Sequence, residues 1–106
     1  MEPTIQHNSV LLIDKLTLNW RNAKKGEVVI LKSLFEKDTY LCKRVMGVKG
    51  DNITTGFRSI DINDGEIWVE GDNSKVSMDS RSFGKLDDYL VMGLVRAVIY
   101  PEVKFI

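Results

Sequence analysis

The sequence has very little cysteine and histidine. Its 106 residues include one cysteine, Cys42, and one histidine, His7. A single cysteine cannot form a disulfide within the chain, and one cysteine with one histidine does not supply the ligand cluster of a zinc site. We therefore expect no internal disulfide, no metal centre and no cofactor.

Long hydrophobic runs and an excess of one charge are also missing. Apolar stretches such as Leu90–Val95 are interrupted, here by Arg96, well before the roughly 20 residues that a membrane-spanning helix needs. No basic-then-apolar leader opens the printed sequence. The 15 basic and 15 acidic residues cancel, and no basic run is interleaved with aromatic residues, which disfavours a nucleic-acid partner. Residues 1–106 are therefore expected to form one soluble domain with one core.

Hydrophobic alternation and short apolar runs predict about six short strands. The continuous run Glu27–Leu31 is typical of a strand that is buried on both faces. The Asn63–Gly65 cluster separates two alternating segments and predicts a hairpin, while Leu86–Met92 predicts a short helical turn before a last strand at Leu94–Tyr100. The fold class is expected to be mostly β, a curled antiparallel sheet or barrel with at most one short helix.

Another alternating segment contains Leu16, Leu18 and Trp20. This pattern favours a half-buried strand whose apolar side chains join the core. The alternative is an exposed stripe that contacts a partner or a membrane surface.

A lysine and an arginine interrupt the apolar strand pattern that begins at Tyr40. Alternation places Lys43 between Leu41 and Val45 on one face, and Arg44 on the opposite face. Both faces are expected to be at least partly buried. Removal from water lowers the pKa of a lysine amine, because desolvation disfavours the ammonium, whereas a guanidinium keeps its proton. Lys43 is therefore a candidate neutral base, unless both charges reach solvent from an edge strand.

The stretch Gly71–Gly84 is polar and is predicted to be irregular. It offers what a buried amine requires: a hydroxyl partner such as Ser77, and the pair Asp79 and Arg81 to hold the loop in place. The alternative is a solvated connector without a function.

Four stretches together resemble, in order and spacing, the sequence boxes of the type I signal peptidases. They are Met1–Thr4, Lys25–Val29, Cys42–Asp51 and Gly71–Arg81, the last with the pattern GDNxxxSxDSR. The similarity spans nearly the whole chain. Ser74 stands where bacterial members usually carry arginine, and the segments MEPTI, CKRV and IWVEGDN resemble the mitochondrial inner membrane branch of the family.

The resemblance implies a serine endopeptidase that uses a Ser-Lys dyad without histidine. Lys43 would be the catalytic base, and His7 a bystander. Ser77 would orient the lysine, and four residues would brace the site: Asp72, Arg44, Asp79 and Arg81. Apolar residues would line shallow pockets for small substrate side chains: Met1, Ile5, Leu41 and Cys42. The implied activity removes sorting or signal peptides on the intermembrane-space side of the mitochondrial inner membrane, with a second peptidase subunit as heterodimer partner.

The nucleophile of this family is a serine that directly precedes the position of Met1. That serine, the anchoring helix upstream of it and part of the oxyanion hole are absent from the printed sequence. Loss of a protease nucleophile costs on the order of 10⁶-fold in rate, so the printed chain is expected to be nearly inactive. A gene model that begins at an internal methionine, a fragment and a subunit without catalysis all remain open.

Three other functions compete with this hypothesis. A non-catalytic subunit would dock an active homologue through Leu16, Leu18 and Trp20. A self-cleaving repressor-type protease shares the Ser-Lys chemistry but lacks the pattern of Gly71–Arg81. A β-barrel ligand binder would explain the strands and leave both polar boxes without a role.

Overall fold

The computed structural model describes residues 1–6, 8–34, 36–73 and 79–106. The strands in these residues are β1 (Val10–Asp14), β2 (Val28–Lys32), β3 (Tyr40–Gly47), β4 (Asn52–Thr55), β5 (Arg58–Asp61), β6 (Glu66–Glu70), β7 (Leu86–Asp87), β8 (Val91–Tyr100) and β9 (Lys104–Phe105). The helical elements are η1 (Thr17–Asn19), α1 (Ser80–Phe83) and η2 (Asp88–Leu90). No helix among the described residues is both long enough and apolar enough to cross a membrane.

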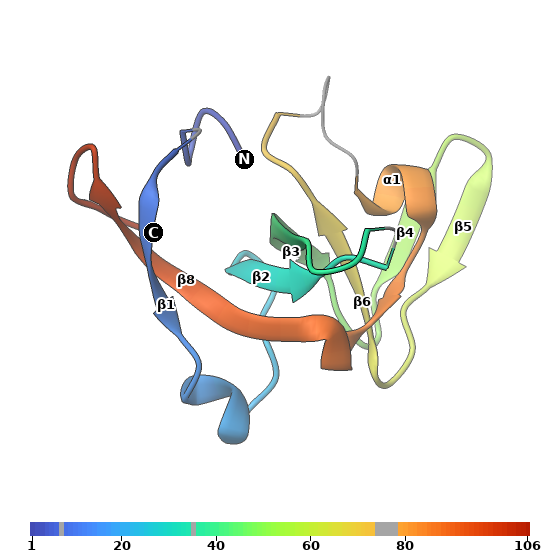
Figure 1. Cartoon of the computed structure of the whole chain (residues 1–106). Helices are drawn as coiled ribbons and strands as arrows, with labels where there is room; N and C mark the ends of the chain where they lie inside the picture. The colour runs from blue at the N-terminus through green and yellow to red at the C-terminus, as the bar shows by residue number, and fades with distance from the viewer. Residues whose placement is uncertain (7, 35, 74–78) are drawn as a thin grey trace.

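The strands form one curled antiparallel sheet in the order β1-β8-β2-β3-β6-β7, with β9 paired to β8. Strands β4 and β5 form a separate hairpin beside it. The long strand β8 curves across the sheet and pairs with both β1 and β2 (Figure 1). The sheet formed by the described residues does not close into a barrel, and these residues contain one α-helix. The predicted mostly β, curled-sheet fold is confirmed.

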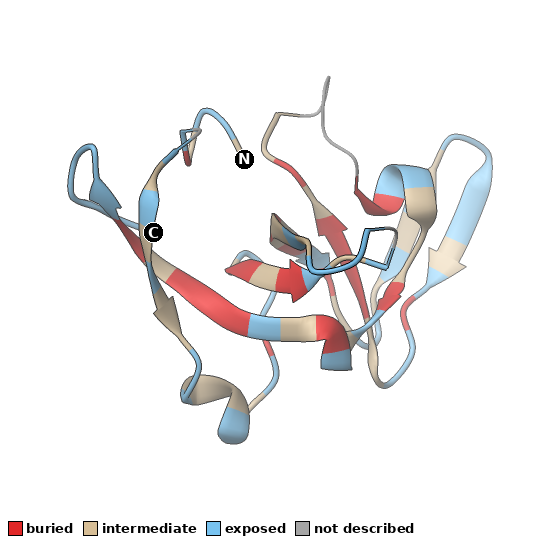
Figure 2. Cartoon of the chain, in the orientation of Figure 1, coloured by how far each residue is buried: buried red, intermediate tan, exposed pale blue. Residues whose placement is uncertain are grey.

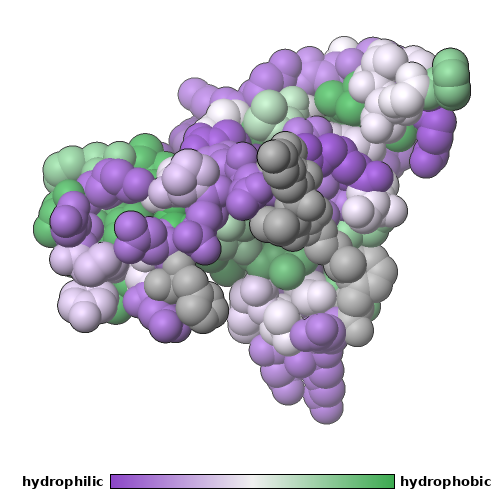
Figure 3. Space-filling model, turned by 90° about the horizontal axis from the view of Figure 1, so that it is seen from above, coloured by the Kyte–Doolittle hydropathy of each residue, from purple (hydrophilic) through white to green (hydrophobic). Residues whose placement is uncertain are grey.

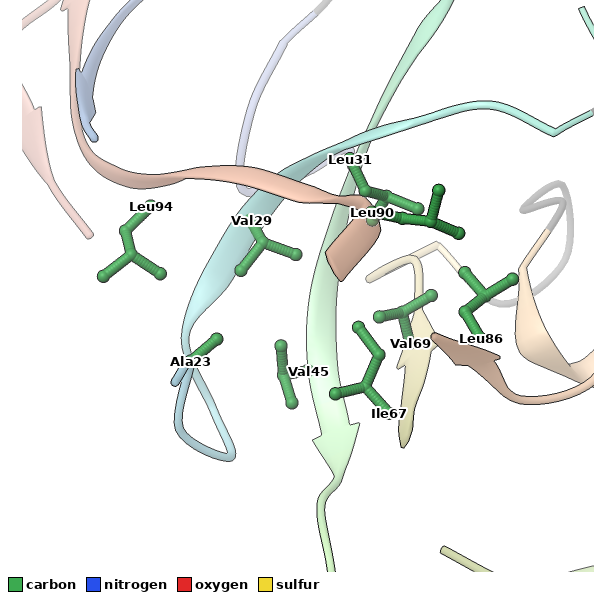
Figure 4. Packing of buried hydrophobic residues seen from close by; sticks show 9 residues of the cluster. All are labelled: Ala23, Val29, Leu31, Val45, Ile67, Val69, Leu86, Leu90 and Leu94. Atoms are coloured by element: carbon green, nitrogen blue, oxygen red, sulfur yellow. The ribbon is translucent and has the colours of Figure 1, made fainter. Parts of the chain in front are cut away.

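Strands β2 and β3 separate two hydrophobic clusters. The first cluster contains Val29 and Leu31 of β2 and Val45 of β3, together with residues of β6 and β8 (Figure 4). The second contains Val28 on the other face of β2, with Ile30 packed against it. Figure 2 shows that burial is concentrated on the central strands of the sheet and that the β4–β5 hairpin is largely exposed. Strand β2 is therefore buried on both faces, as its continuous apolar run predicts.

The strand predicted around Leu16, Leu18 and Trp20 is wrong. Residues Thr17–Asn19 form the η1 turn, with Leu16 73% and Trp20 85% exposed, while Leu18 packs against the first cluster. The Asp14 carboxylate accepts hydrogen bonds from the backbone N–H groups of Leu16 and Thr17, at 2.9 and 3.0 Å. Such a side-chain acceptor satisfies backbone donors that a strand would use in its ladder, and so it stabilises a turn instead.

The predicted hairpin across Asn63–Gly65 is also wrong in its pairing. The chain does turn there, but β5 pairs with β4, and β6 pairs with β3 and β7. A two-residue connection, Gly56 and Phe57, joins β4 and β5, and Gly56 has a φ of 60°, which glycine adopts without strain. The tight local turn therefore gives β5 its partner in β4, and β6 pairs with β3 and β7.

Smaller differences concern the last third of the chain. Helix α1 lies within the stretch that was predicted to be irregular, because Asp79 caps its first turn. The predicted helical turn is present as η2. The strand expected at 94–100 begins earlier, at Val91, directly after η2, and the chain then returns along it as β9.

An ion-pair network joins β1 and β8 to Glu27, the residue directly before β2. Arg96 of β8 donates to the Asp14 carboxylate at 3.0 and 3.1 Å, and its other terminal nitrogen lies 3.4 Å from Glu27 Oε2. Arg21 binds both Glu27 oxygens at 2.8 Å. These hydrogen bonds to Arg21, stronger than the opposing effect of burial, lower the pKa of Glu27 from 4.5 to about 2.

We predict that Glu27→Gln flattens the acid limb of the stability curve. The folded-state pKa of Glu27 is lowered. Its contribution to the free energy of unfolding is therefore fully present above pH 4.5 and is lost as the pH falls through about 2. At pH 7 the variant should lose about 1 kcal/mol, since solvent screens part of the network. Urea unfolding between pH 2 and 7 measures this, with the exposed Glu36→Gln as control. An unchanged pH dependence in Glu27→Gln contradicts the assignment.

Candidate active site

Lys43 lies on the inward face of β3, within the sheet rather than at its edge. In the β2–β3 ladder it is opposite Val29, and on its own strand it lies between Leu41 and Val45. Val29 and Val45 are buried, Leu41 packs against the first cluster, and Lys43 itself is 9% exposed. The alternative in which this lysine extends into bulk solvent from an edge strand is therefore wrong.

The surroundings of Lys43 favour the neutral amine. Burial, which is the largest effect, lowers the pKa of Lys43 below its usual value of 10.5. The negative charge of Asp79 opposes this shift, and the positive charge of Arg81 adds to it. Because burial outweighs the carboxylate, the amine gives up its proton more readily than a lysine in water does.

Asp79 is completely buried and connects the residues after β6 to α1. Its carboxylate accepts hydrogen bonds from the backbone N–H of Gly71 at 2.8 Å and from the backbone N–H of Arg81 at 3.0 Å. The Arg81 guanidinium binds the same carboxylate through Nε at 3.0 Å and through Nη2. The predicted pair of Asp79 and Arg81 is therefore formed, and it joins Gly71 to the start of α1.

Ser80 is a supporting residue to which the sequence reasoning gave no role. Its buried hydroxyl oxygen accepts a hydrogen bond from the backbone N–H of Val69 at 2.9 Å, which attaches the start of α1 to β6. The only sequence signal was its place inside the GDNxxxSxDSR pattern.

Arg44 follows Lys43 on β3, on the opposite face, and forms a second ion pair with Asp72. Arg44 donates through Nε and Nη2 to the two Asp72 oxygens, each at 2.9 Å, and through Nη1 to the carbonyl oxygen of Gly26 at 2.8 Å. The Thr4 hydroxyl donates to the same Asp72 carboxylate. Hydrogen bonding from Arg44 is the main cause that lowers the pKa of Asp72. A charged Asp72 thus joins the N-terminal segment to β3.

Three of the four predicted substrate-contacting residues gather on one face of the sheet. Met1, Ile5 and Cys42 belong to the second cluster or pack against it. Leu41 faces the other way, into the first cluster, because successive side chains of a strand alternate. Burial raises the pKa of the Cys42 thiol, which lowers the fraction of reactive thiolate.

The first residue of the chain lies beside this group. The positive charge of the Met1 amino group acts on the titration of both Cys42 and Asp72. In Figure 1 the N-terminal end is drawn next to the end of β6, in agreement with the contact between Thr4 and Asp72. The structure therefore brings the segment Met1–Ile5 to the strand that carries Lys43.

Two predicted residues cannot be placed. Ser77, the predicted partner of Lys43, and His7, the predicted bystander, both lie outside the described residues. In the part of the chain that is described, no three His, Cys, Asp or Glu side chains are grouped as metal ligands.

Hydrophobic residues are exposed near the N-terminal segment. Figure 3 looks down on this end of the molecule and shows hydrophobic residues on its left, the side of β1 and β8 in Figure 1. The exposed hydrophobic side chains on these strands and on β9 include Val10, Leu12, Ile99, Tyr100 and Phe105. The surface beside the site is therefore suited to apolar contacts.

A family model described as signal peptidase, peptidase S26, matches residues 1–65 and 54–100. The chain belongs to this peptidase family. Subunit 1 of the mitochondrial inner membrane protease is 34% identical in Xenopus tropicalis, over 99% of this chain, and 36% identical in Homo sapiens, over 95%. Subunit 2 of the Saccharomyces cerevisiae protease is 30% identical over 95% of this chain. The chain spans 63 to 66% of the length of these relatives.

The match to the S26 family covers the residues around the buried lysine. The matched residues 1–65 and 54–100 include both the strand of Lys43 and the Asp79–Arg81 pair. The strand of Lys43 and both ion pairs thus lie within the part of the chain that matches the family.

A lysine kept out of water should weaken the fold at neutral pH. We predict that Lys43→Met stabilises the domain by roughly 1 kcal/mol at pH 7, because methionine keeps the stem and has no charge to desolvate. The folded-state pKa of Lys43 is lowered, so the penalty is full at low pH and disappears as the pH rises toward 10.5. Urea midpoints at pH 7 and pH 10.5 measure the effect.

The exposed Lys32→Met is the matched control, and its stability should change by less than about 0.5 kcal/mol. A Lys43→Met protein that is less stable than the parent at pH 7 would show that the amine contributes to folding and is not desolvated at a cost.

Proposed function

We propose that the chain is the catalytic domain of a serine endopeptidase that works through a Ser-Lys dyad. The observation that carries this proposal is the buried Lys43, whose lowered pKa suits a general base, on a strand that contacts the Met1–Ile5 segment. In the boxes that this chain resembles, the nucleophilic serine directly precedes the position of Met1. A serine there would adjoin a methionine that packs against the same cluster as Cys42, the neighbour of Lys43 in sequence.

The proposed peptide-bond cleavage requires the uncharged amine of Lys43. Neutral Lys43 takes the proton of the serine hydroxyl as the oxygen attacks the scissile carbonyl, and an acyl-enzyme forms when the amine of the product leaves with that proton. Water then hydrolyses the acyl-enzyme with the same amine as base. An ammonium cannot accept the proton, so desolvation of Lys43 is the condition for the reaction.

The other residues hold this arrangement in place. The Arg44–Asp72 pair, with the Thr4 hydroxyl, attaches the N-terminal segment to β3. The Asp79–Arg81 pair joins Gly71 to the start of α1, on either side of Ser77 in the sequence. We assign Ser77 the role of orienting the lysine. Met1, Ile5, Leu41 and Cys42 are assigned to pockets for small side chains before the cut.

We further propose that the substrates are proteins with N-terminal sorting or signal peptides delivered to the mitochondrial intermembrane space. The relatives are named subunits of a mitochondrial inner membrane protease, which supports that membrane as the location and a second peptidase subunit as partner. The intermembrane-space side and an anchoring helix upstream of Met1 belong to the same proposal.

The dyad is tested in a protein with a serine directly before Met1. Lys43→Ala should reduce cleavage of a presequence peptide that ends in a small residue by roughly 10³-fold or more, because general-base catalysis is lost. In the parent, kcat/KM should rise with pH through the lowered pKa of Lys43, since only the neutral amine is active.

Lys32→Ala, an exposed lysine on β2, is the control for charge and should cleave like the parent. Retained cleavage by Lys43→Ala would remove the dyad from consideration.

A second candidate function is a non-catalytic subunit that docks an active homologue. The observation that favours it is the exposure of Leu16 and Trp20 at η1, where the side chains were expected to join the core. Under this hypothesis Trp20→Ala should reduce co-purification with the homologous chain about tenfold or more, as for a hot-spot residue. The same change at the exposed Tyr89 is the control. Equal recovery of Trp20→Ala and the parent would exclude this surface.

A further inference from the structure

The strand β9 returns along β8 and reaches the N-terminal segment. Phe105 pairs with Ala97 and Lys104 with Val98, so that β9 is attached to β8. From this strand the Lys104 amine donates a hydrogen bond to the backbone carbonyl oxygen of Thr4, 100 positions earlier in the chain. Two parts of the sequence that are far apart are thereby joined directly.

Thr4 is bonded on two sides. Its carbonyl oxygen accepts from Lys104, and its hydroxyl donates to the Asp72 carboxylate. Asp72 in turn binds Arg44 through two hydrogen bonds of 2.9 Å, and Arg44 follows Lys43 on β3. A continuous series of polar contacts therefore runs from β9, through the N-terminal segment, to the strand of the candidate base.

The segment that these contacts hold has no strand or helix of its own. Residues Met1–Gln6 form a turn in which the Ile5 N–H donates to the Met1 carbonyl oxygen at 3.1 Å. The buried Ile5 and the partly buried Met1 attach it to the second cluster. Apolar contacts are not directional, whereas hydrogen bonds at Thr4 define both position and orientation. Ordering such a segment loses conformational entropy, and contacts must offset this cost in free energy.

We propose that Lys104 is a positioning residue, which fixes Met1–Ile5, and the residue before Met1, against the strand of Lys43. The anchoring itself does not depend on the protease assignment. Its consequence for catalysis rests on the function proposed above, because only then does the residue before Met1 carry the nucleophile. A displacement of about 1 Å between reacting groups can cost on the order of 100-fold in rate.

Cys42 offers a readout of the anchoring in the chain as printed. It is the only cysteine, and Met1 packs in the same cluster. Loss of the Lys104 contact should loosen the segment over Cys42, so Lys104→Met should react with a thiol reagent at least about fivefold faster. Lys104→Arg keeps a cationic donor and should react like the parent. Rates are compared after correction to full thiol ionisation, which separates access from a change in the pKa of Cys42.

Two further variants sharpen this measurement. Lys37→Met removes an exposed lysine elsewhere and should leave the rate unchanged. Thr4→Val removes the hydroxyl donor and keeps the carbonyl acceptor. It should also accelerate labelling, and its effect should be non-additive with that of Lys104→Met, because both act on one segment. If Lys104→Met reacts within twofold of the parent, the proposal is wrong. It is also wrong if the faster reaction is due to unfolding of the domain, which circular dichroism detects.

The catalytic consequence is measured in the protein with a serine before Met1. Lys104→Met should lower kcat at least about tenfold with little change in KM, should leave the pH dependence set by Lys43 in place, and should be rescued by Lys104→Arg. A fall in kcat without faster Cys42 labelling overturns the anchoring. If the parent does not cleave at all, the protease assignment fails, while the Cys42 rates still decide the role of Lys104.

Discussion

A lysine amine held out of water within an antiparallel sheet is the constraint on which this structure depends. Lys43 lies opposite a fully buried valine, on a strand with partners on both sides. Its desolvation lowers its pKa and costs folding free energy, which the hydrophobic clusters of the sheet must offset. The other residues of the candidate site surround the strand that carries this amine.

Two ion pairs near this strand act in different ways. The Asp79–Arg81 pair compensates the charge of the completely buried Asp79, whose carboxylate also acts on the pKa of Lys43. The Arg44–Asp72 pair is directed outward from β3 and binds the N-terminal segment through Thr4. One pair contributes to the electrostatics of the amine, and the other holds the N-terminal segment against the opposite face of the same strand.

Much of the fold could be predicted because its signals are local. The continuous run of β2 and the alternation of β3 specify strands and faces by themselves, since successive side chains of a strand point to opposite sides. The predictions failed where a local sequence pattern was compatible with two structures. At η1 the Asp14 carboxylate satisfies the backbone of Leu16 and Thr17, and for β5 a tighter turn supplies a nearer partner.

For the candidate site, the sequence by itself determined the residue types and the face of β3 on which Lys43 lies. It also predicted the pairing of Asp79 with Arg81, which carry opposite charges two residues apart. Only the tertiary structure decided that Lys43 is buried, that Asp72 meets Thr4 across 68 positions, and that Lys104 reaches the same residue. The physical reason is that burial and long-range hydrogen bonds depend on how the curled sheet brings distant segments together, which no local pattern of residues contains.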